Sequence, residues 1–393
     1  MSKLEELIAE LCPDGVEYRA LAEIARISRG QVMSKEFLRD NAGEYPVYSS
    51  QTEDSGMLGK ITTYMFDGEY LTWTTDGANA GTVFYRKGKF SVTNVCGVID
   101  VTSGQIIPKY LYYFLNREAP QHVNKGMGNP KLMSNVMAKI RIPFPPLPVQ
   151  SEIVKILDNF AELTAELTAE LTARRKQYEY YRDKLLTFDV LEGASDVVWR
   201  TLRSIVKNSC SGGTPAKGNS NYYEGGTIPW IRTQDVQFNE IHKVDTFITE
   251  KAVRETSAKW IPENCVIVAI SGASAGRCAI NKIRATTNQH CLNMEIDPSQ
   301  ALYRYVYYCV CSKYQELLTK KQGARGDLNS SLILETEIPV PPLAVQQNIV
   351  AILDRFDALC NDLTSGLPAE IEARQRQYEY YRDKLLTFKE LTA

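Results

Sequence analysis

The sequence lacks the residue patterns of most catalytic sites. It has only three histidines, His122, His242 and His290, and no two of them are spaced as metal ligands. It has no HExxH motif, no GxGxxG after a strand pattern, and no glycine-rich turn closed by Lys and Ser or Thr. The Asn/Asp-Pro-Pro-aromatic motif of methyltransferases is also absent, because residues 145–147 lack the preceding Asn or Asp. These absences favour a binding protein over an enzyme.

Long apolar runs, a strong net charge and paired cysteines are missing as well. No run is long enough to span a membrane and the start is not a signal peptide, so we expect a cytoplasmic protein without a membrane partner. The nine cysteines show no zinc-site spacing, which predicts reduced and mostly buried thiols. The net charge of -2 argues against non-specific coating of nucleic acid, but not against local basic surfaces. A length of 393 residues allows two or three cores.

What the sequence does have is a long internal repeat. Residues 142–188 read IPFPPLPVQSEIVKILDNF, AELTAELTAELTA and RRKQYEYYRDKLLTF. Residues 338–388 read IPVPPLAVQQNIVAILDRF, a variable middle and RQRQYEYYRDKLLTF. The offset between the copies grows from 196 residues at their start to 200 at their end, so the second copy has four extra residues, aligned at 365–368. A repeat this long and close organises the whole chain.

Each copy predicts a proline-rich lead-in followed by a long helix. The prolines of residues 143–146 cannot join a helix interior, whereas Pro148 suits a helix start. Apolar residues then recur every three or four positions up to Leu185, which predicts one amphipathic helix of about 40 residues and about 60 Å. The second copy has a like stripe from Ile349 to Leu385. Such stripes need partners, and two like helices most simply pair antiparallel. The alternative, two unrelated core helices, is disfavoured because the near-identity includes exposed charges.

The repeat also extends to the segments before the helices. Residues 4–12 look like a short helix closed by Pro-Asp-Gly, and residues 45–48, 70–74 and 82–85 look like strands. The same order of features recurs, although most residues between them differ. The matched segments are 16–21 with 197–202, 45–48 with 228–231, 77–81 with 272–276, 93–94 with 287–288, and 110–113 with 305–308.

We therefore expect an α/β (α+β) fold with two tandem globular domains, each followed by a long helix. The two helices would pair as an antiparallel coiled coil, which gives the chain pseudo-twofold symmetry. The expected ranges are 1–15 for an N-terminal helical segment, 16–141 for the first domain, 142–190 for the central repeat and helix, 197–337 for the second domain, and 338–393 for the C-terminal repeat and helix.

On these residues the chain resembles the specificity subunits of type I restriction-modification systems, over essentially its whole length. The resemblance is carried by the duplicated PPLxxQxxIVxILDxF segment, the duplicated QYEYYRDKLLTF end, and the openings GGTP at 212–215 and IPWI at 228–231. The QYEYYRDKLLTF ends and the Thr-Ala-Glu-Leu unit are most similar to the IC subfamily. The family implies two target recognition domains that each read one half of a bipartite site in double-stranded DNA. It also implies helices that set the unread spacer and dock two modification (methyltransferase) subunits.

The resemblance places the chemistry on partner subunits. S-adenosylmethionine would bind the modification subunit, and ATP and Mg the restriction subunits that join through the complex, while this chain would bind no cofactor or metal and catalyse nothing. Two other functions remain open: a two-domain scaffold that binds protein or glycan, and an enzyme with an unrecognised site. The target bases do not follow from the sequence. Half-sites on one face of DNA about one turn apart would leave an unread gap of roughly six or seven base pairs.

Bases are read by donor and acceptor side chains on loops that fit the major groove. In each domain a polar, basic loop precedes the return to the helix, at 124–131 and at 320–326. Lys and Arg there would mostly meet phosphates, whereas Gln, Asn and Arg232 would read bases. The alternative is solvated loops, and the glycines of the GAxAG segments are expected to make tight turns. The candidates are Ser50, Gln51, Asn79, Lys125, Asn129 and Lys131 in the first domain, and Arg232, Gln234, Ser274, Lys320, Lys321, Arg325 and Asn329 in the second.

The tyrosine-rich helix ends are candidate docking surfaces for another protein, because aromatic residues and Arg favour interfaces. Tyr178 and Tyr181 share the face that can pack on the partner helix, whereas Tyr180 does not. The alternative is surface tyrosines on a long helix. Two copies predict two equivalent docking sites. The candidates are Tyr178, Tyr180, Tyr181 and Arg182 in the first copy, and Tyr378, Tyr380, Tyr381 and Arg382 in the second.

Overall fold

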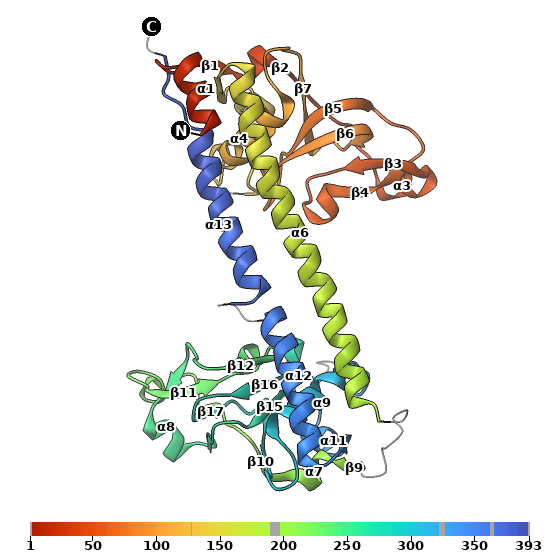
Figure 1. Ribbon diagram of the computed structural model, residues 1–393, viewed down its shortest axis with the longest axis vertical. Helices are drawn as coiled ribbons and strands as arrows, with labels where there is room; N and C mark the ends of the chain where they lie inside the picture. The colour runs from red at the N-terminus through yellow and green to blue at the C-terminus, as the bar shows by residue number, and fades with distance from the viewer. Residues whose placement is uncertain (1, 127, 189–196, 322–326, 362–364, 392–393) are drawn as a thin grey trace. The chain divides into compact units, whose positions relative to one another are not determined.

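The computed structural model describes the whole chain except residues 1, 127, 189–196, 322–326, 362–364 and 392–393. The chain divides into two compact units. Unit 1 joins Met1–Thr168 to Glu370–Ala393, and unit 2 is Ala169–Ala369. The long helix α6 (Leu147–Leu186) contributes residues to both units, as does α13 (Leu367–Leu385), and Figure 1 shows both helices.

Unit 1 contains a six-stranded sheet in the order β2-β7-β5-β6-β3-β4 and a two-stranded sheet of β1 and β8. One core cluster joins Trp73 and Leu71 of β5 to Tyr110 and Leu111 of α4 and to Ile153 of α6. The elements before α6 are α1 (Lys3–Leu11), β1 (Glu17–Ala20), α2 (Leu21–Ile24), β2 (Ala25–Arg29), α3 (Lys35–Asp40), β3 (Ala42–Tyr48), η1 (Glu53–Gly56), β4 (Met57–Ile61), β5 (Phe66–Thr74), β6 (Val83–Val92), β7 (Cys96–Val101), α4 (Pro108–Glu118), η2 (Ala119–His122), α5 (Ser134–Met137) and β8 (Arg141–Phe144).

Unit 2 contains a five-stranded sheet in the order β10-β18-β15-β16-β12, a four-stranded sheet in the order β13-β11-β17-β14, and the pair β19 and β9. Its elements besides the long helices are β9 (Val198–Thr201), α7 (Leu202–Ile205), β10 (Val206–Ser211), η4 (Ser220–Tyr222), β11 (Ile228–Ile231), η5 (Thr233–Asp235), β12 (Asn239–Ile241), β13 (Phe247–Ile248), α8 (Glu250–Glu255), β14 (Trp260–Ile261), β15 (Val266–Ala269), η6 (Gly272–Ser274), β16 (Cys278–Asn281), β17 (Ala285–Thr287), β18 (Cys291–Ile296), α9 (Tyr303–Ser312), α10 (Tyr314–Thr319), α11 (Ser330–Leu334) and β19 (Glu337–Val340). The predicted mixed α/β class with two repeated domains is confirmed.

The long helices differ between the two copies. The first copy forms one helix of 40 residues, α6, as predicted. The prediction of a like helix in the second copy is wrong in part, because that copy forms two helices of 19 residues, α12 (Leu343–Asn361) and α13. Gly366 lies directly before α13 and Pro368 is its second residue. Both belong to the four extra residues, and proline is tolerated in a first helical turn but not in a helix interior.

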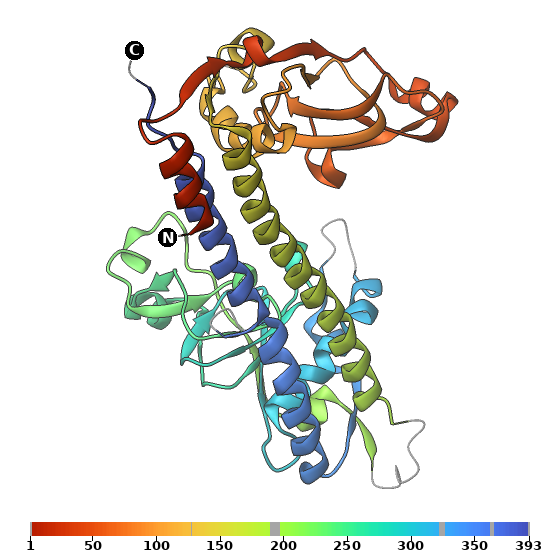
Figure 2. The same ribbon diagram turned by 45° about the horizontal axis from the view of Figure 1, so that its top comes forward.

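Helices pair antiparallel within each unit, as predicted for the two copies. In unit 1 the start of α6 lies beside the end of α13 (Figures 1 and 2). The rings of Phe160 and Tyr381 stack there with centroids 5.5 Å apart. In unit 2 the end of α6 lies beside α12, and Tyr181 stacks on Phe356 at 5.8 Å. Each unit therefore combines its domain with the start of one repeat copy and the end of the other.

The C-terminal segment completes the domain of unit 1. The backbone N–H of Val16 donates to the carbonyl of Lys389 at 2.8 Å, and the N–H of Leu391 donates to the carbonyl of Val16 at 3.0 Å. Glu390 also pairs with Arg141 at 2.6 Å. The two ends of the chain thus belong to one folded unit.

The strand register corrects one sequence match between the domains. Tyr48 of β3 is paired with Val92 of β6, and in unit 2 Ile231 of β11 is paired with Thr287 of β17. Thr93 therefore corresponds to Asn288, and the match of residues 93–94 to residues 287–288 is wrong by one position. The shared Thr-Asn pair is too short to fix a register, whereas the backbone hydrogen bonds fix it.

Candidate nucleic-acid interface

A buried glutamine of the repeat ties the first long helix to the domain of unit 1. The side chain of Gln150 is fully buried and donates to the carbonyls of Pro145 at 2.8 Å and Gln105 at 3.0 Å. Its oxygen accepts from the N–H of Ile107 at 2.8 Å, the residue that precedes α4. All of its bonds go to backbone groups, which explains the glutamine of the PPLxxQ motif as a joint between helix and domain.

Gln346 makes the same joint in unit 2. It donates to the carbonyls of Pro341 at 2.8 Å and Gln300 at 3.2 Å, and accepts from the N–H of Leu302 at 2.9 Å, the residue before α9. The aspartate of the same motif accepts a hydrogen bond from a tyrosine hydroxyl in both units. Tyr113 donates to Asp158, and Tyr308 donates to Asp354, each at 2.5 Å. The repeat therefore mounts both domains with one set of bonds.

Each domain gathers several loops at one end of its sheets. In unit 1 the N–H of Leu132 donates to Thr75, and in unit 2 the N–H of Leu328 donates to Ile270, at 2.9 and 2.8 Å. These bonds tie the loop that returns to the helix to the turn after the central strand. We call the two groups of loops rim 1 and rim 2. Rim 1 comprises residues 49–52, 76–79, 93–95 and 129–131; rim 2 comprises residues 232–235, 271–274, 288–290 and 327–329.

The GAxAG segments form the same turn in both rims. Gly77 and Gly272 have positive φ of 93° and 71°, and Gly81 and Gly276 have φ of 87° and 90°. Only glycine adopts these values without strain, so the expectation of tight turns is confirmed. The two turns differ in their middle residue, which is Asn79 in rim 1 and Ser274 in rim 2.

Rim 1 brings Ser50, Gln51, Asn79 and Lys131 together. The amide of Asn79 donates to the hydroxyl of Thr52 at 3.1 Å, which links the turn to the loop after β3. The amide of Gln51 donates to the carbonyl of Met57, and Lys131 lies 3.6 Å from the carboxylate of Asp76. The other two candidates, Lys125 and Asn129, are exposed on the same returning loop.

Rim 2 brings Arg232, Gln234, Ser274 and Asn329 to the matching loops. The side-chain oxygen of Asn329 accepts from the N–H of Ser331 at 2.9 Å and caps α11. The Nε atom of Arg232 is buried and has no hydrogen-bond partner among the described residues. The remaining candidates follow α10: Lys320 pairs with Glu316 at 2.5 Å, Lys321 is half-buried, and Arg325 lies outside the described residues.

Several polar rim residues were missed by the sequence reasoning. In unit 2 Gln289 bonds to Thr214, and Ser271 donates to Asp327 at 2.7 Å. In unit 1 Gln31 forms a backbone bridge with Thr93. Asn288 to His290 follow β17 directly and could have been found from the correct register. Asp76 and Asp327 were passed over because DNA favours positive charge, yet a carboxylate can accept from the cytosine amino group.

The tyrosine-rich helix ends divide into buried and exposed faces. Tyr180 is 61% exposed and Tyr380 is 63% exposed, whereas Tyr178 is buried in the core of unit 2. Tyr181 is partly exposed at 38% while it stacks on Phe356, and Tyr378 and Tyr381 are half-buried. The arginines Arg182 and Arg382 each lie 2.8 Å from the aspartate that follows them. Tyr180 and Tyr380 are therefore the most exposed tyrosines of the two helix ends.

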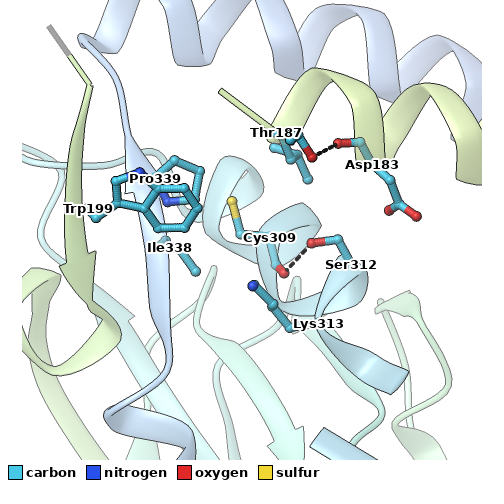
Figure 3. A pocket seen from close by; sticks show the side chains of 9 residues that line it. Asp183, Thr187, Trp199, Cys309, Ser312, Lys313, Ile338 and Pro339 are labelled. Atoms are coloured by element: carbon cyan, nitrogen blue, oxygen red, sulfur yellow. Dashed lines mark hydrogen bonds between the residues drawn. The ribbon is translucent and has the colours of Figure 1, made fainter. Parts of the chain in front are cut away.

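A pocket of about 240 Å³ in unit 2 lies where the end of α6 meets the domain (Figure 3). Its hydroxyl groups are already satisfied by their own helices: Thr187 donates to the carbonyl of Asp183, and Ser312 donates to that of Cys309, both at 2.8 Å. Burial raises the pKa of Cys309 to about 12, so its thiol stays protonated and unreactive. The pocket therefore has no activated nucleophile, and we interpret it as a gap in the packing between the end of α6 and the domain of unit 2.

The other cysteines are also mostly buried and unreactive. All nine cysteines are free and eight are buried, which confirms the expectation that the thiols are mostly buried. Burial raises the pKa of both Cys96 and Cys291 to about 12.

Within the described ranges no group of three His, Cys, Asp or Glu side chains could hold a metal ion. No helix in the part of the chain that the structure describes is long and apolar enough to cross a membrane.

Comparison with known proteins defines the class. The family model described as the type I restriction modification DNA specificity domain matches residues 13–174 and again residues 195–373. The chain belongs to this family, as the resemblance of its repeats predicted. The match to the IC subfamily stays a prediction.

Individual relatives support the same family. The chain is 39% identical over 353 residues to the type I restriction enzyme EcoR124I/EcoR124II specificity subunit of Escherichia coli, covering 87% of this chain and 84% of that protein. It shares its fold with the S subunit of a type I restriction-modification system from M. genitalium, with a TM-score of 0.60 at 16% identity over 95% of this chain and 96% of the other. A chain from a structural study of complex assembly in the type I R-M system matches with a TM-score of 0.64 at 14% identity, covering 96% of this chain and 98% of the other.

Proposed function

We propose that this chain is the DNA sequence-recognition subunit of a type I restriction-modification complex. Each domain would read one half of a bipartite site in double-stranded DNA through the major groove, with rim 1 on one half-site and rim 2 on the other. The observation that carries this proposal is that the two rims share their backbone and differ in their side chains. Gly77 and Gly272 make the same turn, whereas Lys131 in rim 1 is replaced by Asp327 in rim 2.

The contacts to DNA divide by chemistry. Lys125, Lys131, Lys320 and Lys321 would meet phosphates, which fixes the register of each domain on the duplex. The amide and guanidinium groups of Gln51, Asn79, Arg232 and Gln234 would read base edges, because they offer paired donors or acceptors. The net charge of -2 suits this division, since positive charge is needed only at the rims.

The helices would connect recognition to chemistry on other subunits. We infer that two modification subunits dock on the helix ends, where Tyr180 and Tyr380 expose aromatic surface at equivalent positions of the two repeats. S-adenosylmethionine would bind those subunits, and ATP and Mg the restriction subunits that join through them. This chain would supply no catalytic group, so purified chain with S-adenosylmethionine and target DNA should transfer no methyl group until the modification subunit is added.

Selection from random duplexes tests the proposal. The purified complex of this chain with its modification subunits is incubated with a random duplex library, and the bound pool is sequenced after a gel shift. The expected pool contains two short motifs separated by a fixed unread gap of roughly six or seven base pairs. A scaffold for protein or glycan ligands would select no sequence. Methyl transfer by the lone chain would show that this chain itself is a methyltransferase.

A further inference from the structure

Arg86 is a buried cation beneath rim 1. It lies on β6 with 6% of its surface exposed, and its guanidinium carbon lies 3.5 Å from the ring centroid of Tyr48 and 4.4 Å from that of Phe84. Burial lowers the pKa of its guanidinium, and the groups that oppose this shift, Tyr48, Cys96 and Tyr112, include no carboxylate. Arginine keeps its charge in proteins, and burying a charge is costly unless the site uses its hydrogen bonds.

The hydrogen bonds of Arg86 connect the sheet to a rim loop. Its Nε atom donates to the hydroxyl of Thr72 at 3.1 Å, within the sheet. Its Nη2 atom donates to the carbonyl of Ser55 at 2.7 Å, in the loop of residues 49–56. The fork of one guanidinium thus joins a central strand to the loop that presents Ser50 and Gln51.

The loop needs this anchor because its backbone is strained. Asp54 and Ser55 have positive φ of 47° and 53°, a region that residues other than glycine seldom adopt. Gly56 follows with φ of 85°, and its carbonyl accepts from the N–H of Ser49 at 2.9 Å, which closes the loop. A bond to the carbonyl of Ser55 therefore acts at the strained point of the turn.

Unit 2 does not use the corresponding position in this way. Arg86 lies opposite Tyr70 on β5, and the strand pairing of unit 2 places Asn281 of β16 at the same position. Asn281 donates to the carbonyls of Pro262 and Ile283 at 2.6 and 3.0 Å, which are outside rim 2. The hydrogen bond from this strand position to a rim loop is therefore specific to the first domain and is not required by the fold.

We propose that Arg86 is a positioning residue that fixes the shape of loop 49–56 and so determines specificity for the first half-site. This rests on the proposed function, because it assumes that rim 1 reads DNA. Arg86 touches no base itself. It holds the backbone from which Ser50 and Gln51 reach the groove, and a shift of that backbone would move both side chains together.

The test uses the complex with modification subunits and two duplex libraries, each randomised in one half-site only. Arg86→Met removes both hydrogen bonds and keeps much of the buried volume. It is expected to reduce discrimination among first half-site sequences at least tenfold and to leave the second half-site profile unchanged. Arg86→Lys keeps the charge but loses the fork, and should restore only part of the discrimination.

Two further variants separate positioning from stability. Val98→Ala removes buried volume from β7 of the same sheet and should leave both half-site profiles unchanged at a comparable loss of thermal stability. Gly56→Ala disturbs the anchor from the loop side, since an added Cβ would lie 3.3 Å from Nη2 of Arg86 and 3.0 Å from the carbonyl of Gln51. It should reproduce the first half-site defect even if Arg86→Met fails to fold.

The outcomes separate the two proposals. A wild-type first half-site profile in a folded Arg86→Met complex, or in Gly56→Ala where Arg86→Met does not fold, would overturn the role of Arg86, as would an equal loss of discrimination in Val98→Ala. If the wild-type complex itself reads no split site, the proposed function fails, and the role of Arg86 falls with it.

Discussion

Gln346 makes in unit 2 the same backbone hydrogen bonds that Gln150 makes in unit 1, with 2.8 Å to the carbonyl of the proline five residues earlier in both cases. The two domains differ in most surface residues, yet they are attached to their helices by identical joints. A domain mounted in this way can change its rim without changing its placement.

The joint should be needed for stability. Gln346→Leu would leave the N–H of Leu302 and the carbonyl of Pro341 buried without partners. We expect the free energy of unfolding of unit 2 to fall by about 2–6 kcal/mol, at about 1–3 kcal/mol for each of these two unsatisfied groups. Chemical denaturation measures this, with Gln347→Leu at the exposed neighbouring position as the control. Equal midpoints for the two variants would show that the joint contributes nothing.

Asp357 should make unit 2 less stable as the pH rises. Burial raises the pKa of its carboxyl; a hydrogen bond from Asn361 and the charge of Arg304 oppose the rise, and the charges of Asp354 and Glu240 add to it. A carboxyl with a raised pKa binds its proton more tightly in the folded state. Its favourable contribution is therefore complete below the unfolded pKa and is lost as the pH rises through the folded value.

Thermal unfolding at several pH values checks this prediction. Asp357→Asn should be more stable than the wild type at pH of about 8, with the difference shrinking toward pH of about 4. Asp297 is the control of opposite sign, because hydrogen bonds from Gln300 and Ser299 lower the pKa of its carboxyl. Its contribution is present above the unfolded pKa and lost in acid, so Asp297→Asn should lose stability at the higher pH. A pH-independent difference for Asp357→Asn would contradict the account.

Arg232 should read a guanine in the second half-site. Its Nε atom has no partner among the described residues, and arginine to the O6 and N7 atoms of guanine is the commonest specific contact in the major groove. Arg232→Ala should cost about 1–3 kcal/mol of discrimination at one base pair and leave the other positions unchanged. Methylation rates on single-base variants of the target measure it. Lys207→Ala on β10 is the control, and a uniform loss across all sequences would assign Arg232 to a phosphate instead.

The Thr-Ala-Glu-Leu repeat should act as a ruler. Thr164 and Thr168 each donate to the carbonyl four residues earlier within α6, so the repeat is helical. One more unit after Leu171 would add about 6 Å and a net rotation of roughly 40°, close to the ~35° that one base pair adds to DNA. The rotation, and not the added length, should determine how much the unread gap changes. A domain that is turned away from the groove loses its base contacts, whereas bending of the DNA absorbs a small axial mismatch.

Mapping methylated sites for this insertion tests the ruler. The unread gap should lengthen by one base pair while both half-site sequences stay the same. An unchanged gap, or an altered half-site, would show that the repeat does not set the spacing.

The sequence was most informative where the chain repeats itself. The periodicity up to Leu185 predicted α6, and the apolar residues at 45–48 and 70–74 predicted strands that the sheet of unit 1 contains. The break between α12 and α13 was missed, although Gly366 and Pro368 lie beside it, because the near-identity of the copies suggested equal helices.

The rims were harder to predict because tertiary structure assembles them. Ser50, Asn79 and Lys131 were chosen singly, and only the folded sheet shows that their loops adjoin. Arg86 gave no signal, since one arginine in a strand pattern does not reveal burial or a bond to a loop some 31 residues earlier. Polarity and loop position can propose contacts, whereas strand register and burial decide which residues share a surface.

Replacement of the first domain is the direct test that each domain reads its own half-site. Residues 16–140 are exchanged for the first domain of another family member, the complex is assembled with the same modification subunits, and methylated sites are mapped. We expect a new first half-site, with the second half-site and the unread gap unchanged. A change in both half-sites together would contradict the division of reading between the two domains.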